Sequence, residues 1–144
     1  MKTVHQLLRA KGADIWAIDP DATVYEALTL LAEKNIGALL VVQERRLVGI
    51  FSERDYARKV ILKGKHSKET RIREIMTGTP ICVAPLKTIE ECMSLMTGNH
   101  IRHLPVLEAD KLLGIVSIGD VVKAIMEEQQ GTISHLENFI TGGR

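Results

Sequence analysis

The sequence predicts an α/β fold of the α+β type, built from two similar units that pack as a pseudo-twofold pair. The first observation behind this prediction is a direct repeat: residues 47–55 read LVGIFSERD and residues 112–120 read LLGIVSIGD. The second is that identical residues recur at a constant separation of 65 positions, which favours two copies of one supersecondary unit. These pairs include Pro20 and Pro85, Thr23 and Thr88, Glu26 and Glu91, Leu39 and Leu104, and Asp55 and Asp120.

The composition fits a well-buried aliphatic core. The chain has 144 residues, 45% of them hydrophobic and only 3% aromatic, so Ile, Leu and Val must fill the core. A net charge of +1 argues against a broad surface for nucleic acid or anionic membrane. No apolar run reaches the roughly 18 residues that span a bilayer, and the N-terminus lacks a signal layout, so we expect a soluble, cytoplasmic protein. In that compartment Cys82 and Cys92 are expected to be reduced thiols.

The first unit, residues 3–62, is expected to contain a helix, a short strand, a helix, two strands and a closing helix. Thr3 and Gln6 have the spacing of a capping box, which predicts a helix that Gly12 ends. The later elements are a strand at 15–18, a helix opened by the capping box of Thr23 and Glu26, strands at 38–42 and 47–51, and a helix at 55–62. A polar, basic linker at residues 63–71 follows.

The second unit, residues 72–127, repeats this plan. Its expected elements are a helix from Ile72, a strand at 81–83, a helix opened by the capping box of Thr88 and Glu91, strands at 103–107 and 112–116, and a closing helix at 121–126. Residues 128–144 are expected to hold one further short helix after Gly131, with Ser134 and Glu137 as its capping box, and a frayed tail at 141–144.

The Ser-x-x-Asp motif that ends each repeated strand has two interpretations. Ser52 with Asp55, and Ser117 with Asp120, have the spacing of a capping-box variant that does no more than start a helix. A carboxylate also accepts two hydrogen bonds side by side, which suits a ribose diol, and a helix N-terminus attracts phosphate. The motif alone is compatible with both.

A cationic cluster distinguishes the two units. Arg102 offers a planar fork for phosphate oxygens and His103 a second donor, just before the strand that pairs with residues 112–116. Gly37 and Ala38 stand at the equivalent places of the first unit, so the two sites cannot be equal. The cluster favours the second unit as the binding site, against the alternative of a solvated patch or a structural histidine.

The chain offers no group for catalysis. It contains no phosphate-binding G-x-x-x-x-G-K-[ST] loop, no G-x-G-x-x-G fingerprint, no HExxH and no G-x-S-x-G elbow. We therefore expect pockets without a reactive group, no metal site and no enzyme activity.

The tandem repeat, with G-h-h-S-x-x-D in each copy and I-R-H-L-P-V in the second, resembles a pair of CBS domains, also called a Bateman module. The resemblance covers residues 3 to 127 and implies two CBS repeats, each a small mixed sheet flanked by helices. Modules of this family commonly bind AMP, ADP, ATP, NAD(H) or S-adenosylmethionine in the cleft between the repeats.

The resemblance also implies roles for individual residues. Ribose hydroxyls would be bound by Ser52, Asp55, Ser117 and Asp120. Phosphates would be bound by Arg102, His103, Arg54 and Arg58. Adenine pockets would be lined by Ile15, Ala17, Ile18, Thr79, Pro80 and Ile81.

The resulting hypothesis is a non-catalytic regulatory module that binds an adenine nucleotide or dinucleotide and acts on an unknown partner protein in trans. In this it resembles short bacterial CBS proteins, and the resemblance implies a homodimer. The alternative is a ligand-independent structural or protein-interaction module in which the aspartates only cap helices. An enzyme acting on nucleotides and a nucleic-acid-binding protein are both disfavoured.

Overall fold

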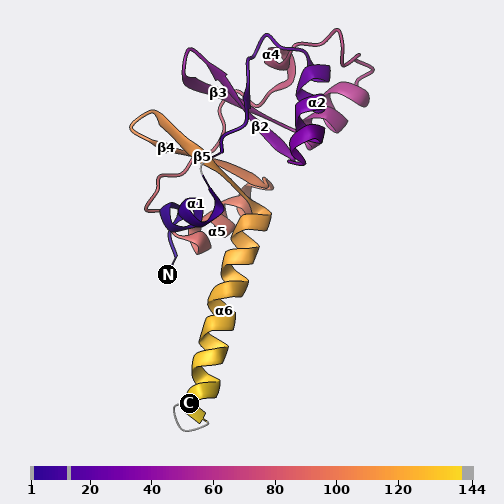
Figure 1. Ribbon diagram of the computed structural model, residues 1–144. Coiled ribbons are helices and arrows are strands. Elements are labelled where there is room, and N and C mark those ends of the chain that lie inside the picture. Colours follow the sequence, from indigo (N-terminus) through magenta and orange to yellow (C-terminus); the bar gives the residue numbers. More distant parts are fainter. Residues whose placement is uncertain (1, 13, 141–144) are drawn as a thin grey trace.

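The computed structural model describes residues 2–12 and 14–140, without the side chain of Phe139. Figure 1 shows two small sheets side by side, with α2 and α4 beside one sheet and α1, α5 and α6 beside the other. The predicted α+β class is confirmed; the expected frayed tail at 141–144 lies outside the described residues. The elements are α1 (Val4–Lys11), β1 (Ala17–Ile18), α2 (Val24–Lys34), β2 (Ala38–Gln43), β3 (Arg46–Ser52), α3 (Glu53–Asp55), η1 (Tyr56–Ile61), α4 (Ile72–Ile75), α5 (Ile89–Asn99), β4 (His103–Glu108), β5 (Lys111–Ser117) and α6 (Ile118–Ile140).

The two hairpins have the same register, as the repeat predicts. β2 pairs with β3 antiparallel, with Leu39 opposite Phe51, and β4 pairs with β5 with Leu104 opposite Val116. Each hairpin turn has two successive residues with positive φ, Glu44 and Arg45 in the first and Ala109 and Asp110 in the second. Two such residues suit the tight turn that matches the twist of paired strands. The hairpins therefore form equivalent frames for the two Ser-x-x-Asp motifs.

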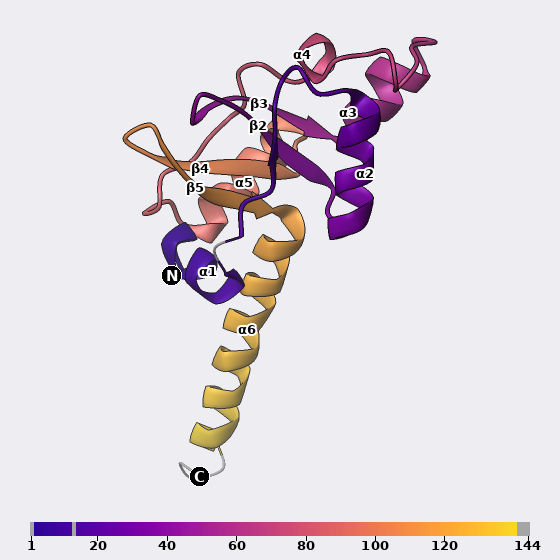
Figure 2. The ribbon, with the colours of Figure 1, turned by 45° about the horizontal axis from the view of Figure 1, so that its top comes forward.

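The opening helix of each repeat packs in the core of the other repeat. Val4 and Leu7 of α1 lie in the core of the second repeat, whereas Ile72 and Ile75 of α4 lie in the core of the first. Backbone hydrogen bonds show the same exchange of helices. The Val4 N–H donates to the Lys87 carbonyl at 2.8 Å, and the Ile72 N–H of α4 donates to the Ala22 carbonyl at 2.9 Å. Figure 2 shows α1 against α5 and the start of α6. Neither repeat closes its core without a helix from the other.

The strand predicted at 81–83 is reduced to a single bridge. Val83 pairs in parallel with Val106, donating to the Pro105 carbonyl and accepting from Leu107, each at 2.9 Å. Pro80 has no N–H to donate and Pro85 turns the chain shortly afterwards, so no longer ladder can form. In the first repeat the strand predicted at 15–18 forms only as β1 (Ala17–Ile18).

The predicted break in the C-terminal helix is wrong. Residues 118 to 140 form one helix, α6, which extends beyond the body of the molecule (Figure 1). Gly131 lies inside this helix, where a glycine costs only about 1 kcal/mol relative to alanine, and the preceding Glu and Gln residues are good helix formers. Ser134 accepts a weak hydrogen bond from Gln130 at 3.5 Å, and so lies in mid-helix rather than at a cap.

The closing helix predicted at 55–62 begins two residues earlier, at Glu53, and changes from α-helical to π-helical hydrogen bonding. The single turn α3 starts at Glu53 and runs directly into η1, which has π-helical hydrogen bonds. The equivalent α6 is a regular α-helix, so the two repeats differ in structure immediately after their Ser-x-x-Asp motifs.

Gly49 in β3 and Gly114 in β5 leave room for the chain of the exchanged helix to lie close against each strand. A methyl group added at either glycine should therefore lower stability. A Cβ at Gly49 would lie 2.7 Å from Met76 Sδ and 2.7 Å from the Thr77 carbonyl oxygen, whose backbone is held to β3. We expect Gly49→Ala to lower the free energy of unfolding by about 1–3 kcal/mol, measured by urea denaturation. Gly114→Ala should cost less, because its nearest neighbour is a flexible methyl of Leu8 at 3.1 Å.

Gly98 in α5 provides the control, since an added Cβ there meets nothing within 4 Å. Gly98→Ala should stabilise the protein by up to about 1 kcal/mol through helix propensity. Equal unfolding free energies for Gly49→Ala and the wild type would contradict the close approach of the exchanged helix.

Candidate functional site: a cleft between the repeats

A cleft of about 840 Å³ lies where the two repeats meet. Cavities of a few hundred to about 1,000 Å³ are the usual size of small-molecule sites. Its walls come from β3, α3 and η1 of the first repeat, the segment that follows α4, and the segment from the end of α5 to the start of β4. The predicted site residues that line it are Ser52, Arg54, Asp55, Arg58, Thr79, Pro80, Ile81, Arg102 and His103.

The aspartate at this cleft completes the capping box of α3, whose N-cap is Ser52. Asp55 Oδ2 accepts from the Ser52 backbone N–H at 2.9 Å and from the Ser52 hydroxyl at 3.1 Å, and the Asp55 N–H donates to Ser52 Oγ at 3.2 Å. Its second oxygen, Oδ1, pairs with Lys59 Nζ at 3.0 Å. The capping box is therefore formed, and the carboxylate is held in one orientation at the cleft wall. Capping and ligand binding are compatible here, because each carboxylate oxygen has more than one lone pair.

The cleft has an excess of positive charge. Arg54, Arg58, Lys59 and Arg102 line it, together with His100 and His103, whereas its carboxylates are Glu53 and Asp55. Arg54 also connects the repeats, because its Nη1 donates to the His100 carbonyl at 2.7 Å. An anionic ligand would find guanidinium groups from both repeats, which are the groups best suited to phosphate oxygens.

His103 lies half-buried beside this charge. A Cβ added to Gly37 would lie 3.5 Å from His103 Cε1 and 3.4 Å from Glu53 Oε1, so the imidazole packs against the glycine backbone next to that carboxylate. Burial lowers the pKa of His103 below its ordinary value, the nearby Lys11 charge lowers it further, and the Asp120 charge acts in the opposite direction. The neutral imidazole is therefore favoured in the free protein.

The cationic cluster lies between the two Ser-x-x-Asp motifs, since His103 pairs with Ser117 in the β4–β5 register and the Asp120 charge affects its pKa. Arg102 and His103 line the cleft that contains Asp55. Their backbone does adjoin β5, since the Ile118 N–H donates to the Arg102 carbonyl at 2.8 Å. The repeats face each other about the pseudo-twofold axis, so the side chains at the start of β4 reach the helix start of the other repeat.

Asp120 has a different environment. Its Oδ2 accepts from the Ser117 N–H at 2.9 Å, and from Lys11 Nζ at 2.7 Å. Lys11 also donates to the Ile115 carbonyl at 2.8 Å. Burial by itself raises the pKa of Asp120, but the hydrogen bonds from Lys11 and Ser117 outweigh it and hold the pKa below its ordinary value.

The remaining predicted adenine-pocket residues do not line the cleft with Asp55. Ala17 and Ile18 belong to β1, where they pair with Leu40 and Val41, and Ile15 is half-buried just before this strand. Trp16 lies among them, with Lys34 Nζ 4.2 Å from its ring centroid. The predicted residues are thus divided between the cleft and its pseudo-symmetric counterpart.

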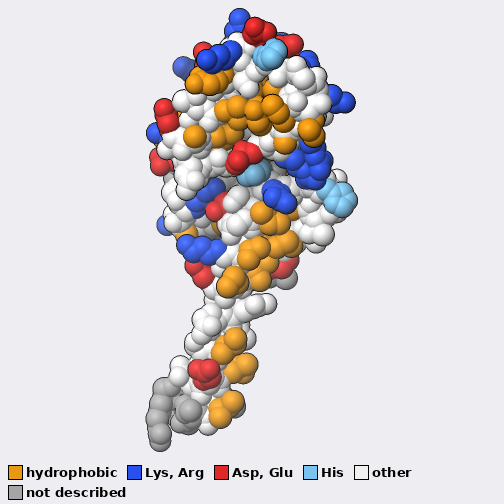
Figure 3. Space-filling model, turned by 90° about the vertical axis from the view of Figure 1, so that its right-hand side faces the viewer, with side chains coloured by type: hydrophobic (Ala, Val, Ile, Leu, Met, Phe, Trp, Pro, Cys, Tyr) orange, Lys and Arg blue, Asp and Glu red, His pale blue; other side chains and the backbone are white. Residues whose placement is uncertain are grey.

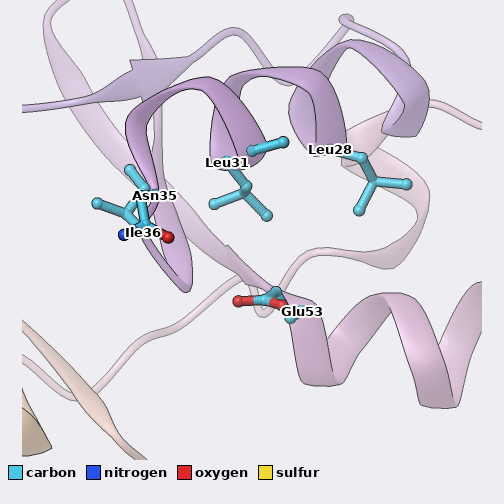
Figure 4. Close-up of a pocket in the computed structure, with 6 residues that line it drawn as sticks. Leu28, Leu31, Asn35, Ile36 and Glu53 are labelled. Carbon is cyan, nitrogen blue, oxygen red and sulfur yellow. The ribbon is translucent and has the colours of Figure 1, made fainter.

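Sequence reasoning missed several contributors. Glu53 lines the cleft and also a smaller pocket of about 190 Å³ beside α2. In this smaller pocket Leu28 and Leu31 of α2 lie on the side facing Glu53 (Figure 4). Lys11 was also missed, because it lies in the last turn of α1, which the shorter α4 of the second repeat lacks. Figure 3 shows acidic, histidine and basic side chains together at the middle of one face, between hydrophobic patches.

The comparisons with known proteins identify the family. The family model described as CBS domain matches twice, at residues 11–62 and 72–127. The chain belongs to the CBS-domain family. The Arabidopsis thaliana CBS domain-containing protein CBSX3, mitochondrial, is 40% identical over 98% of this chain and 73% of its own.

Solved CBS structures agree in fold. A Burkholderia ambifaria protein with CBS domains is 49% identical, with a TM-score of 0.86 over 89% of this chain and 96% of its own. The CBS domain pair of protein MJ0100, solved with 5-methylthioadenosine and S-adenosyl-L-methionine, is 25% identical, with a TM-score of 0.79 over 89% of this chain and 98% of its own.

In the part of the chain that the structure describes, no three His, Cys, Asp or Glu residues are grouped so as to hold a metal ion. None of the described helices is sufficiently long and apolar to cross a bilayer.

The lowered pKa of His103 predicts a pH-dependent stability. As pH falls below about 6.5 the unfolded chain takes up a proton at this histidine before the folded protein does, so the free energy of unfolding falls. The free energy of unfolding falls by about 1.4 kcal/mol for each tenfold difference in the proton affinity of His103 between the unfolded and folded states. We expect His103→Gln to reduce the slope of unfolding free energy against pH between about pH 6.5 and 5.

The exposed His135→Gln serves as the control and should keep the wild-type slope, measured by urea denaturation without ligand. An unchanged slope in His103→Gln would mean that burial does not disfavour the imidazolium form.

Proposed function

We propose that this CBS pair is a non-catalytic regulatory module that binds an adenine nucleotide or dinucleotide in the cleft containing Asp55. The observation that carries the proposal is the composition of this one cleft: a fixed carboxylate, guanidinium groups from both repeats and an apolar wall at Pro80 and Ile81. The complex of the MJ0100 domain pair with two adenosine compounds supports the nucleoside part.

Each part of the ligand has a matching group in the cleft. Asp55, with Ser52, accepts from the ribose hydroxyls through carboxylate lone pairs. Arg102 and His103, with Arg54 and Arg58, bind the phosphates, and Thr79, Pro80 and Ile81 contact the base. The excess of positive charge favours AMP, ADP, ATP or NAD(H) over an uncharged nucleoside, because guanidinium groups bind phosphate with short, charge-assisted hydrogen bonds.

A ligand in this cleft would change how the repeats are held together. The cleft walls come from both repeats, and Arg54 spans them through the His100 carbonyl. A ligand that binds one arrangement of the repeats more tightly shifts the population towards it. The shift would be passed on to a partner protein in trans, whose identity the site chemistry does not specify.

A homodimer would present this change to the partner. Ile61, Leu62, Val122 and Met126 on the two closing helices are exposed apolar side chains, and Ile61 and Met126 occupy equivalent positions of the repeat. Exposed apolar side chains on the closing helices of both repeats suit association with a second copy. The free thiols Cys82 and Cys92 fit the cytoplasm predicted from the sequence.

The test uses the two aspartates as a matched pair. Asp55→Asn and Asp120→Asn alter the same capping box in each repeat, so both should lose similar stability, about 0.5–2 kcal/mol. Only Asp55→Asn should weaken nucleotide binding, by about tenfold or more, since hydrogen bonds to a charged group contribute about 1.5–3 kcal/mol. Calorimetry and thermal shift with AMP, ADP, ATP, NAD, NADH and S-adenosylmethionine measure both effects.

A ligand present at 100 times its dissociation constant should add about 2.7 kcal/mol of stability to the wild type. If none of the six compounds stabilises the wild type, the ligand-independent interaction module is the better description and the aspartates only cap helices. Equal weakening by the two asparagine variants would place the ligand outside the cleft with Asp55.

A further inference from the structure

The two halves of this CBS pair provide an internal comparison of two potential clefts. The separation of 65 positions matches Asp120 with Asp55, and it also matches the residues around them. The cleft residues Ile81, Asn99 and Arg102 correspond to Trp16, Lys34 and Gly37. Lys11 lies in the last turn of α1, which the shorter α4 lacks. The counterpart cleft has therefore lost an arginine and gained two lysines and an indole.

Lys11 is the residue that gives Asp120 a different partner from that of Asp55. It is the last residue of α1, and the packing of this exchanged helix in the second core directs its ammonium to Asp120 at 2.7 Å. The same ammonium donates to the Ile115 carbonyl at 2.8 Å. In the first repeat the equivalent carbonyl, that of Ile50, accepts instead from the backbone N–H of Thr77 at 3.0 Å.

Asp55 also has a lysine partner, but with a different geometry. Lys59 reaches it from one turn further along the same helical segment and binds Oδ1, leaving a wide cleft beside the carboxylate. Lys11 instead comes from a separate helix and joins α1 to α6 and β5, binding the same Oδ2 that the Ser117 N–H donates to. An added ligand would have to compete with Lys11 for Asp120, whereas at Asp55 it has a ready cavity.

The apolar wall of the counterpart cleft is covered as well. Lys34 Nζ lies 4.2 Å from the centroid of the Trp16 ring. Trp16 and Lys34 are the equivalents of Ile81 and Asn99, both of which line the open cleft. A base that stacked on Trp16 would have to displace a cation–π contact, which contributes about 0.5–1 kcal/mol at an exposed site.

We propose that Lys11 determines nucleotide occupancy: it occupies the Asp120 carboxylate, so the chain binds one nucleotide, at Asp55, while the Asp120 cleft stays closed. This inference rests on the proposed function. A ribose hydroxyl is a neutral donor and cannot replace a charge-assisted bond of similar length without loss, since charged hydrogen bonds are roughly twice as strong. The Lys34–Trp16 contact adds to the closure.

The experiment is isothermal titration with ATP and with AMP on the full chain, comparing the wild type with Lys11→Met, which removes the ammonium group and keeps an unbranched side chain of similar length. The wild type should bind one nucleotide per chain, and Asp55→Asn should weaken that binding by about tenfold or more. Lys11→Met should bind two, and Asp120→Asn in that background should remove the second event alone.

Two variants control for charge and folding. Lys11→Arg keeps a cation at Asp120 and should retain one site, whereas Lys123→Met removes an exposed lysine of α6 and should behave as wild type. If Lys11→Met does not fold, Lys11→Gln removes the charge while keeping a donor, and it should also open the second site.

The outcomes separate this inference from the proposed function. Two sites on the wild type, or one site on every folded Lys11 variant, would overturn the role of Lys11 and leave nucleotide binding intact. Weaker binding in Lys11→Met would assign Lys11 to the ligand's phosphate and also overturn the closed-cleft role. No binding of ATP, AMP or any other of the six compounds to any variant would overturn both.

Discussion

The exchange of opening helices is the constraint on which the rest of this structure depends. Val4 of α1 and Ile72 of α4 are fully buried, each in the core of the repeat to which it does not belong. Burying one such side chain contributes about 1.5–3 kcal/mol, so neither repeat closes its core alone. The two repeats must therefore form together, in one relative arrangement. The cleft between them is a consequence of core packing.

This arrangement explains why the cleft combines residues that are distant in sequence. The aspartate comes from α3, directly after β3, whereas the apolar wall follows α4 and the arginine precedes β4. α4 packs in the first core, so the chain leaving it at Thr77 must run along β3, where it pairs with Ile50. The positive charge of the second repeat thereby faces the capped carboxylate of the first.

Local features of this fold could be predicted from the sequence because they depend on neighbouring residues. The capping boxes at Thr3, Thr23 and Thr88 and the equivalent hairpins follow from spacing and apolar runs, and all are confirmed. The helix exchange could not be predicted, because an amphipathic helix carries no label for the core it will enter. For the same reason the sequence could not show that Arg102 lines the cleft with Asp55, since sequence proximity does not decide which way a side chain faces across a pseudo-twofold axis.

The two repeats also contribute unequally to the cleft with Asp55. Gly37 is the equivalent of Arg102, and both residues line this cleft. A Cβ at Gly37 would be in van der Waals contact with the Glu53 carboxylate and the His103 ring, so the glycine lies directly against these two groups. The second repeat therefore contributes an arginine where the first contributes only backbone. Because residues of both repeats line this one cleft, a substitution in either repeat changes the same site.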